Sequence, residues 1–162
     1  MTTRRTWYPI LVAAASALAV AALGASATDV GPWYQALHKP SWQPPDWLFG
    51  PAWTLIFGLA ALSGVLAWRA AATRAARQRI MLLFALNGLL NVAWTELFFR
   101  IRRPDWALVE VIPFWISILV LVIALAPIST GASRAMVPYL IWVAFAAWLN
   151  LAVVQLNGTF SG

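Results

Sequence analysis

The sequence predicts an all-α membrane protein, a five-transmembrane-helix bundle with a structured first loop acting as a lid. Hydrophobic residues make up 62% of the 162 residues and charged residues only 10%, whereas soluble domains are about half apolar and about a quarter charged. The apolar residues form five long runs that are almost free of charge. These runs are continuous and do not alternate with polar residues, which argues against a transmembrane barrel.

Charged residues mark the ends of these runs, and a membrane-spanning helix needs about 20 apolar residues. The first helix is expected after Arg4 and Arg5. The second lies between Asp46 and Arg69, and the third contains one charge, Glu96. The five expected helices cover residues 7–27, 47–68, 80–99, 106–126 and 135–156, and they form a single domain over 1–162.

The first run has a second possible interpretation. Two arginines, an apolar stretch and Ala25-Ser26-Ala27 imitate a secretory signal peptide with its cleavage site. We interpret the run as a retained span, with a cleaved leader as the alternative.

Small residues permit close helix packing, and Gly88 with Ala85 on the third helix is a candidate dimer seam.

The basic residues indicate an orientation in the membrane. Seven lie on one side of the expected bundle and four on the other, so the positive-inside rule predicts a cytoplasmic N-terminus and an external first loop. The clusters lie between apolar runs, so the net charge of +6 indicates a membrane partner and no nucleic acid. The absence of Cys and the Ala- and Arg-rich composition suit an integral protein of a bacterial cell envelope. The basic residues on the first side are Arg4, Arg5, Arg69, Arg74, Arg77, Arg79 and Arg134.

Several function classes are excluded. With no Cys and one His, the chain has no disulfide framework, no thiolate metal site and no site of several His ligands, so no metal centre is expected. No hydrolytic triad and no phosphate-binding loop is visible.

The first loop, residues 28–46, is rich in proline and aromatic residues. Its segment from Asp29 to Asp46 holds four Pro, two Trp and one Tyr. Proline stiffens the loop and lowers the entropy cost of ordering it, which favours a lid that closes a pocket. Residues 33–37 are expected to form a helical turn, Asp46 to cap the second helix, and Pro51 to fall near its first turn. The alternative is an aromatic belt at the membrane interface.

Three separated segments resemble the translocator protein family, also called tryptophan-rich sensory proteins or peripheral-type benzodiazepine receptors. The first is Trp33-Tyr34-x-x-Leu37-x-Lys39-Pro40-x-Trp42-x-Pro44-Pro45, followed by Trp53-x-x-x-Phe57. The second is Asn87 with Asn91-x-x-Trp94 and Phe98-Phe99, and the third is Pro138-Tyr139-Leu140-x-Trp142 with Leu149-Asn150. The match covers nearly the whole chain.

The resemblance implies a homodimeric five-helix bundle whose outer pocket is closed by the first loop. Family members are similar in binding tetrapyrroles such as protoporphyrin IX and haem, and drug-like small molecules. Some bacterial members degrade porphyrin in a light-dependent reaction that needs two tryptophans, which correspond to Trp53 and Trp142. After Arg134 there is no Lys or Arg, so the animal cholesterol motif is incomplete. Phe57 stands where many relatives have Tyr.

Helical spacing independently places aromatic and amide side chains on shared faces. If these faces converge, they form an aromatic box that suits a flat apolar ligand, with Lys39 at the water side to meet ligand carboxylates. The alternatives are that the aromatic stripe is packing and that the amides are interhelical hydrogen-bond partners. The expected ligand-binding residues are Trp33, Tyr34, Lys39, Trp42, Phe49, Trp53, Phe57, Asn87, Asn91, Trp94, Tyr139, Trp142, Phe145, Ala146 and Leu149.

The sequence is compatible with three functions. The first is a membrane receptor or translocator that binds protoporphyrin IX or haem as a ligand, with no tightly bound cofactor. The second is photo-oxidative degradation of porphyrin by Trp53 and Trp142. The third is a proton-coupled small-molecule exporter that uses Glu96, although Glu96 lies four residues before Arg100, where an i,i+4 ion pair is expected.

Overall fold

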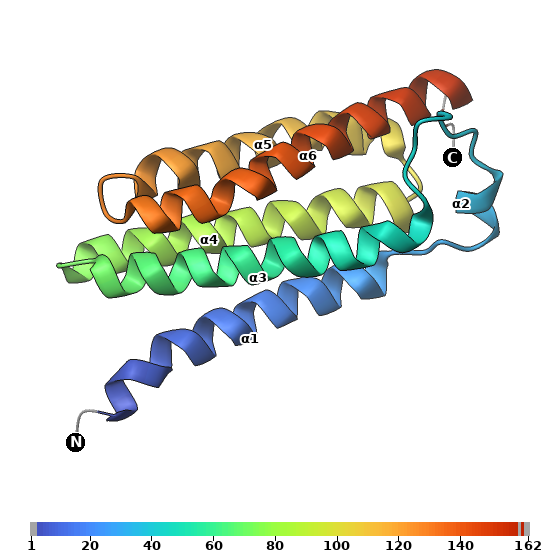
Figure 1. Cartoon of the computed structure of the whole chain (residues 1–162). Helices are drawn as coiled ribbons and strands as arrows, with labels where there is room; N and C mark the ends of the chain where they lie inside the picture. The colour runs from blue at the N-terminus through green and yellow to red at the C-terminus, as the bar shows by residue number, and fades with distance from the viewer. Residues whose placement is uncertain (1–2, 159, 161–162) are drawn as a thin grey trace.

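The computed structural model describes residues 3–158 and 160, and the side chains of 7–158 and 160. Five of its helices are long and apolar enough to cross a membrane, as predicted, and no strand occurs in the described part of the chain. The expected domain 1–162 also includes residues 1–2, 159 and 161–162, which lie outside the described residues. The elements are α1 (Thr3–Ala27), α2 (Pro32–Ala36), α3 (Asp46–Ala70), α4 (Arg74–Thr95), the π-helix η1 (Glu96–Arg100), α5 (Pro104–Leu125) and α6 (Thr130–Asn157) (Figure 1).

The helices α4 and α6 begin before the apolar runs that were expected from the sequence, because each has a polar first turn. The α4 helix begins at Arg74, where the Thr73 hydroxyl accepts a hydrogen bond from the Ala76 N–H at 3.1 Å. The α6 helix begins at Thr130, where Ser129 accepts from the Ala132 N–H at 3.2 Å. Such caps satisfy backbone N–H groups that have no partner inside the helix.

The start of α3 differs from the expectation. Asp46 is the first residue of the helix and Pro45 occupies the N-cap position, with no side-chain cap. Pro51 lies inside the helix, beyond the first turn, and its missing N–H leaves the Trp47 carbonyl without the usual helical donor. The Asp46 carboxylate instead accepts hydrogen bonds from the first loop, as described below.

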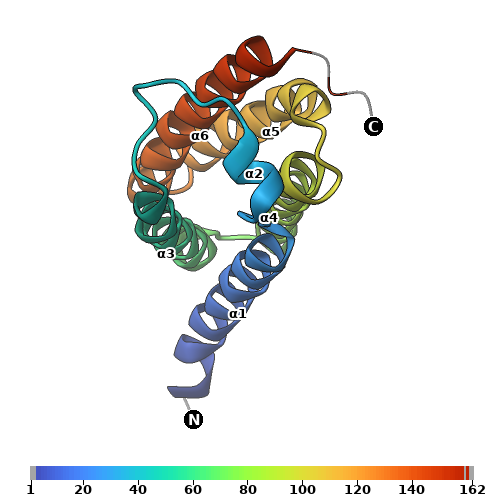
Figure 2. The same cartoon turned by 90° about the vertical axis from the view of Figure 1, so that its right-hand side faces the viewer.

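The helices α3, α4, α5 and α6 form a ring, and α1 stands outside it (Figure 2). Most of the fully buried side chains, among them Phe114, Ile118, Leu121, Met136 and Val143, lie on α5 and α6. The α1 helix packs on α3 and α4 and diverges from them toward its N-terminus (Figure 1). We call the end that carries α2 the loop end, and the end with the α3–α4 and α5–α6 connections the basic end.

Gly88, expected at a dimer seam, lies close to α1 of the same chain. A Cβ atom at Gly88 would lie 3.1 Å from a methyl carbon of Val20 on α1. Ala85 and Gly88 both face the space between α1, α3 and α4. The small residues of the third long helix therefore accommodate α1 of the same chain.

Candidate functional site

The first loop packs across the loop end of the ring (Figure 2). Within it, α2 spans Pro32–Ala36, close to the expected turn at 33–37. The Asn157 side chain at the end of α6 holds the loop, because its Oδ1 accepts the His38 N–H at 2.8 Å and its Nδ2 donates to the His38 carbonyl at 2.8 Å. A second tie is the ion pair between Arg102 and Asp29 at 3.4 Å.

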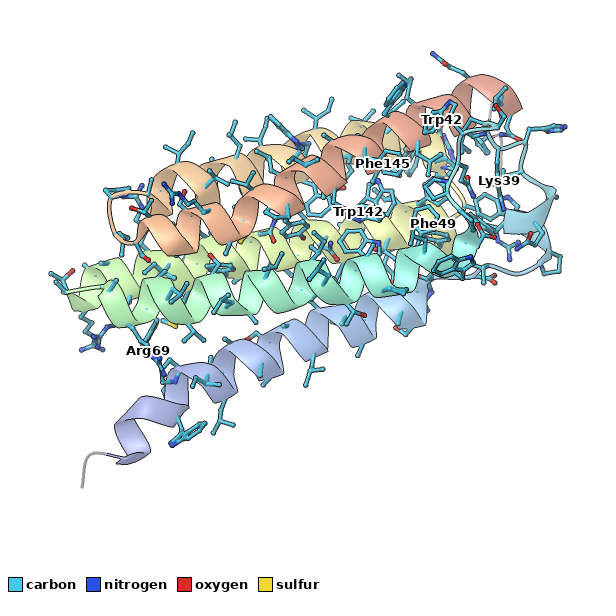
Figure 3. The ribbon with its side chains drawn as sticks, in the orientation of Figure 1. Lys39, Trp42, Phe49, Arg69, Trp142 and Phe145 are labelled. Atoms are coloured by element: carbon cyan, nitrogen blue, oxygen red, sulfur yellow. The ribbon has the colours of Figure 1, made fainter. Side chains whose placement is uncertain are left out.

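Seven aromatic side chains from the loop, α3 and α6 form a continuous series, which we call the aromatic column. Trp53 stands at its centre, with ring centroids 5.4 Å from Phe57, 6.2 Å from Tyr139 and 6.2 Å from Trp142. Trp142 also contacts Phe49 at 5.9 Å and Phe145 at 5.6 Å. Figure 3 shows Trp142, Phe49, Phe145 and Trp42 gathered between α3 and α6 near the loop end. The column consists of Trp42, Phe49, Trp53, Phe57, Tyr139, Trp142 and Phe145.

Trp42 connects the column to the first loop. Its ring lies 6.1 Å from Phe145 and 4.9 Å from the exposed Trp148. Ala146 and Leu149, the remaining residues expected from α6, are half-buried on that helix. Trp53 and Trp142 are also half-buried, and their mutual contact shows that both rings turn toward the space between α3 and α6.

The other expected aromatic residues form a second cluster where α2 packs on the end of α4 and on η1. Trp33 lies 6.4 Å from Phe98, and the buried Tyr34 lies 5.7 Å from Phe99. Trp94 contacts Phe98 at 5.5 Å. The structure therefore divides the expected aromatic residues between two neighbouring groups.

The expected amides bridge helices. Asn87 Nδ2 donates to the Ser117 hydroxyl of α5 at 2.9 Å, and Asn91 Nδ2 donates to the Tyr139 hydroxyl of α6 at 3.1 Å. Asn150 accepts from Trp94 Nε1 at 3.3 Å and donates to the Pro104 carbonyl at 2.8 Å. In this state the amides act as interhelical partners, which was the alternative considered for Asn87 and Asn91.

Two buried polar groups in the same half of the bundle have no partner. Trp142 Nε1 and both carboxylate oxygens of Glu110 are buried without a hydrogen bond. Buried polar groups are nearly always paired, and an ionisable residue inside a membrane bundle indicates a functional site. Glu110 was not singled out from the sequence, where it marks the charged start of a long apolar run. Its position three residues after the buried Ala107 and four before the buried Phe114 would have placed it on the interior face.

Glu96 has a different environment. It pairs with Arg100 at 3.4 Å as the spacing predicts, and both residues belong to η1, which directly follows α4. Because its charge is already balanced there, Glu96 is a weak candidate for a proton-coupling acid.

A small polar group lies where the loop meets α3. The Tyr34 hydroxyl donates to Asp46 at 3.2 Å, and the Lys39 ammonium lies 3.8 Å from Asp46 and 3.6 Å from the Tyr34 ring centroid. Burial, with the Asp46 charge as a second cause, raises the pKa of Tyr34 to about 12. Lys39 is thus at the water side as expected, and a ligand carboxylate there would share it with Asp46.

Among the described residues, no group of three His, Asp or Glu side chains could hold a metal ion. The five apolar helices and the aromatic groups at one end define an integral membrane protein of the helical-bundle class. Comparison with known proteins shows to which family within this class the chain belongs.

A sequence model of the TspO/MBR family matches residues 10–156. The chain is 41% identical to the tryptophan-rich protein TspO of Chlorobaculum tepidum over 77% of this chain and 79% of that protein. It is 37% identical to the tryptophan-rich protein TspO of Archaeoglobus fulgidus, over 91% and 98% of the two chains. It is 33% identical to the translocator protein of Homo sapiens, over 80% and 78%. The chain belongs to the TspO/MBR family.

Proposed function

We propose that this protein is a membrane receptor or translocator that binds tetrapyrroles, such as protoporphyrin IX or haem, and similar flat apolar molecules at the aromatic column. The observation that carries the proposal is the partnerless, buried N–H of Trp142 within a series of rings from three elements. Indole and phenyl rings stack on flat π-systems, and a ligand acceptor at Trp142 would supply the missing hydrogen bond.

The first loop would close over the bound ligand. Its contacts favour this role, because Trp42 packs on Phe145 and Lys39 lies at the rim. A porphyrin carries two carboxylates at one edge. We expect that edge to face Lys39, since the opposite orientation would bring a carboxylate toward the unpaired Glu110.

Binding is tested by titrating detergent-solubilised protein with protoporphyrin IX and following tryptophan fluorescence. Saturable quenching is expected, and Trp142→Phe should weaken the affinity roughly fivefold to tenfold because it removes one buried hydrogen-bond donor. Trp106→Phe is the matched control, since Trp106 is 53% exposed and contacts Arg103 away from the column. The absence of saturable quenching in the unaltered protein would reject the proposal.

A light-dependent reaction is a second candidate, favoured by the contact between Trp53 and Trp142 at 6.2 Å. The excited porphyrin would take an electron from one indole, which the other indole could refill, and would pass that electron to dioxygen, leaving one oxidised tryptophan and one superoxide. The superoxide formed beside the ring would then be the oxidant that attacks the porphyrin. Illuminating the complex in the presence of oxygen should bleach the porphyrin absorption band. Bleaching that continues at full rate in the double variant Trp53→Phe, Trp142→Phe would reject the tryptophan mechanism.

The orientation and assembly are part of the same proposal. We infer a cytoplasmic basic end and a loop end outside the cytoplasm of a bacterial cell, because the basic end carries the excess of arginine. We also propose a homodimer. Cross-linking in membranes and labelling of single cysteines, introduced at His38 and Arg74, test assembly and orientation.

A further inference from the structure

An apolar slot lies between α1, α3 and α4, beside the aromatic column. Its volume is about 580 Å³, which is within the range of ligand sites in proteins. The slot exists because small side chains do not fill the space between the facing surfaces of the helices. These small residues are Ala13, Ser16 and Ala17 on α1 and Ala60, Ala61 and Gly64 on α3. Phe57, Asn87 and Tyr139 form the boundary between the slot and the centre of the bundle.

The slot is long enough for a lipid chain and opens toward the membrane. On α1 the lining runs from Tyr8 to Leu23, which is about 22 Å at 1.5 Å per residue. One leaflet of a hydrocarbon core about 30 Å thick measures about 15 Å. Tyr8, Leu23 and Leu89 at the edges of the slot are each more than half exposed, so the slot opens sideways toward the membrane.

A cationic side chain lies at the basic end of the slot. Trp68 lines the slot, and the Arg77 guanidinium lies 5.5 Å from the Trp68 ring centroid. Arg77 Nε is buried and has no hydrogen-bond partner. The Arg69 side chain extends from the end of α3 toward α1 (Figure 3).

The charges of the whole chain are divided unevenly between the two ends. All five acidic residues belong to the half of the bundle next to the loop end: Asp29, Asp46, Glu96, Asp105 and Glu110. The basic end holds seven arginines and no acidic residue, while the other half has a net charge of −1, which together give the net charge of +6. Anions that balance the basic end must therefore come from outside the chain.

We propose that the slot binds one acyl chain of an anionic phospholipid, whose phosphate pairs with the Arg77 guanidinium. Basic groups between helices on the cytoplasmic side suit anionic headgroups, and guanidinium groups match phosphate geometry. The site does not depend on tetrapyrrole binding. Phe57 and Tyr139 border both sites, but the slot differs from the aromatic column in being lined mainly by α1 and α4, in opening toward the basic end, and in having a cation beside it.

Native mass spectrometry of the detergent-solubilised full chain, with added phosphatidylglycerol or phosphatidylcholine of the same acyl chains, tests the proposal. Arg77→Gln should weaken phosphatidylglycerol binding about fivefold, the factor that one basic residue beside an anionic lipid contributes, and leave phosphatidylcholine unchanged. Arg134→Gln is the matched control, because Arg134 is an exposed arginine at the same end, outside the slot. Inorganic phosphate at millimolar concentration should not displace the lipid.

A second pair of variants tests the acyl chain. Ala17→Phe places a ring in the slot and should reduce binding of both lipids at least tenfold, whereas Ala15→Phe on the exposed face of α1 should not. Equal lipid binding in Arg77→Gln and the unaltered protein, or full binding in Ala17→Phe, overturns the proposal. Loss of protoporphyrin quenching in Ala17→Phe would show that the slot is the porphyrin's own site and also overturns it. A dimer lost in Ala17→Phe, with no lipid bound to the unaltered protein, would instead assign the slot to a second copy of the chain.

Discussion

The Asn157 side chain is the tie whose removal should most directly release the first loop. It makes two hydrogen bonds of 2.8 Å to the backbone of His38, and a third to the Val153 carbonyl keeps it in place. Asn157→Ala removes both bonds to the loop. Asn157→Asp keeps the acceptor for the His38 N–H and loses the donor, so it should show an intermediate effect.

The expected magnitude follows from the number and exposure of these bonds. A net contribution of about 0.5–1.5 kcal/mol for each hydrogen bond, taken toward its lower half because His38 is exposed, gives about 1–2 kcal/mol for Asn157→Ala. The open population of the loop should therefore rise roughly fivefold to thirtyfold. Helix α6 itself should be unaffected, because the substitution lies at its last residue.

Amide hydrogen exchange of residues 29–45 measures the opening, and the dissociation rate of protoporphyrin IX measures its consequence. Both rates should rise by the same factor if the loop must open before the ligand leaves. Gln155→Ala is the control, since Gln155 is exposed on the same last turn. Unchanged exchange in Asn157→Ala would refute the assignment of Asn157 as the tie. Faster exchange with an unchanged dissociation rate would show that the loop is not the lid.

Three further predictions concern stability. Asn150→Leu should lower the free energy of unfolding by about 2–4 kcal/mol in a detergent thermal-denaturation assay, because it leaves Trp94 Nε1 buried without a partner and removes the side-chain donor to the Pro104 carbonyl; a change below 1 kcal/mol would contradict this. Glu110→Leu should raise the apparent melting temperature by a few degrees, since it removes a buried carboxylate that has no partner, and a fall would mean that the carboxylate has a partner in solution. Because the pKa of Tyr34 is raised to about 12 from the ordinary value of about 10, the docked loop keeps the phenol proton longer than the open loop. Loop protection against proteolysis should be constant below pH 10 and fall as the pH rises toward 12, and Tyr34→Phe should lack this step.

The five helices were predictable because the membrane imposes a simple rule on sequence. A span must satisfy its backbone internally and present an apolar surface, so charges fall near the ends of the spans. The same rule places the helix ends wrongly, because it finds the part of each helix that lies in the apolar layer of the membrane. It does not find the polar turns by which a helix extends beyond that layer. Arg74–Arg79 lies in α4 although it contains three arginines, because Thr73 caps the helix before the apolar run begins.

The partners of individual side chains were less predictable than the faces they occupy. Helical spacing placed Phe49, Trp53 and Phe57 together, and the structure gives Trp53–Phe57 contact at 5.4 Å. Spacing within one helix does not say which helix lies opposite, so the pairing of Asn91 with Tyr139 and the separation of Trp33 and Trp94 from the column required the fold.

The two glutamates show the same limit for charge. Glu96 was conspicuous because it interrupts an apolar run, yet Arg100 balances it one turn away. Glu110 was inconspicuous because it stands at the boundary of a run, yet both its oxygens are buried and unpartnered. A charge that interrupts an apolar run is visible from its position in the sequence. The energetic cost of a buried carboxylate, in contrast, depends on the groups that surround it in the folded structure. If the exporter alternative is correct, Glu110 is therefore a better coupling acid than Glu96.

The packing of the aromatic column indicates how a flat ligand must enter it. Trp53 meets Tyr139 and Trp142 edge to face, at interplanar angles of 80° and 88°, so neither ring lies parallel to Trp53 and ready to sandwich a planar guest against it. A guest has to replace such contacts, each worth about 0.5–1.5 kcal/mol beyond burial, with stacking of its own. The rings on α3 and α6 cannot separate freely while Trp42 lies on Phe145 and Asn157 holds His38. Loop release and ring separation should therefore occur together. For this reason we expect the rate of ligand dissociation to respond to Asn157→Ala, although Asn157 lies at the end of α6 and outside the aromatic column.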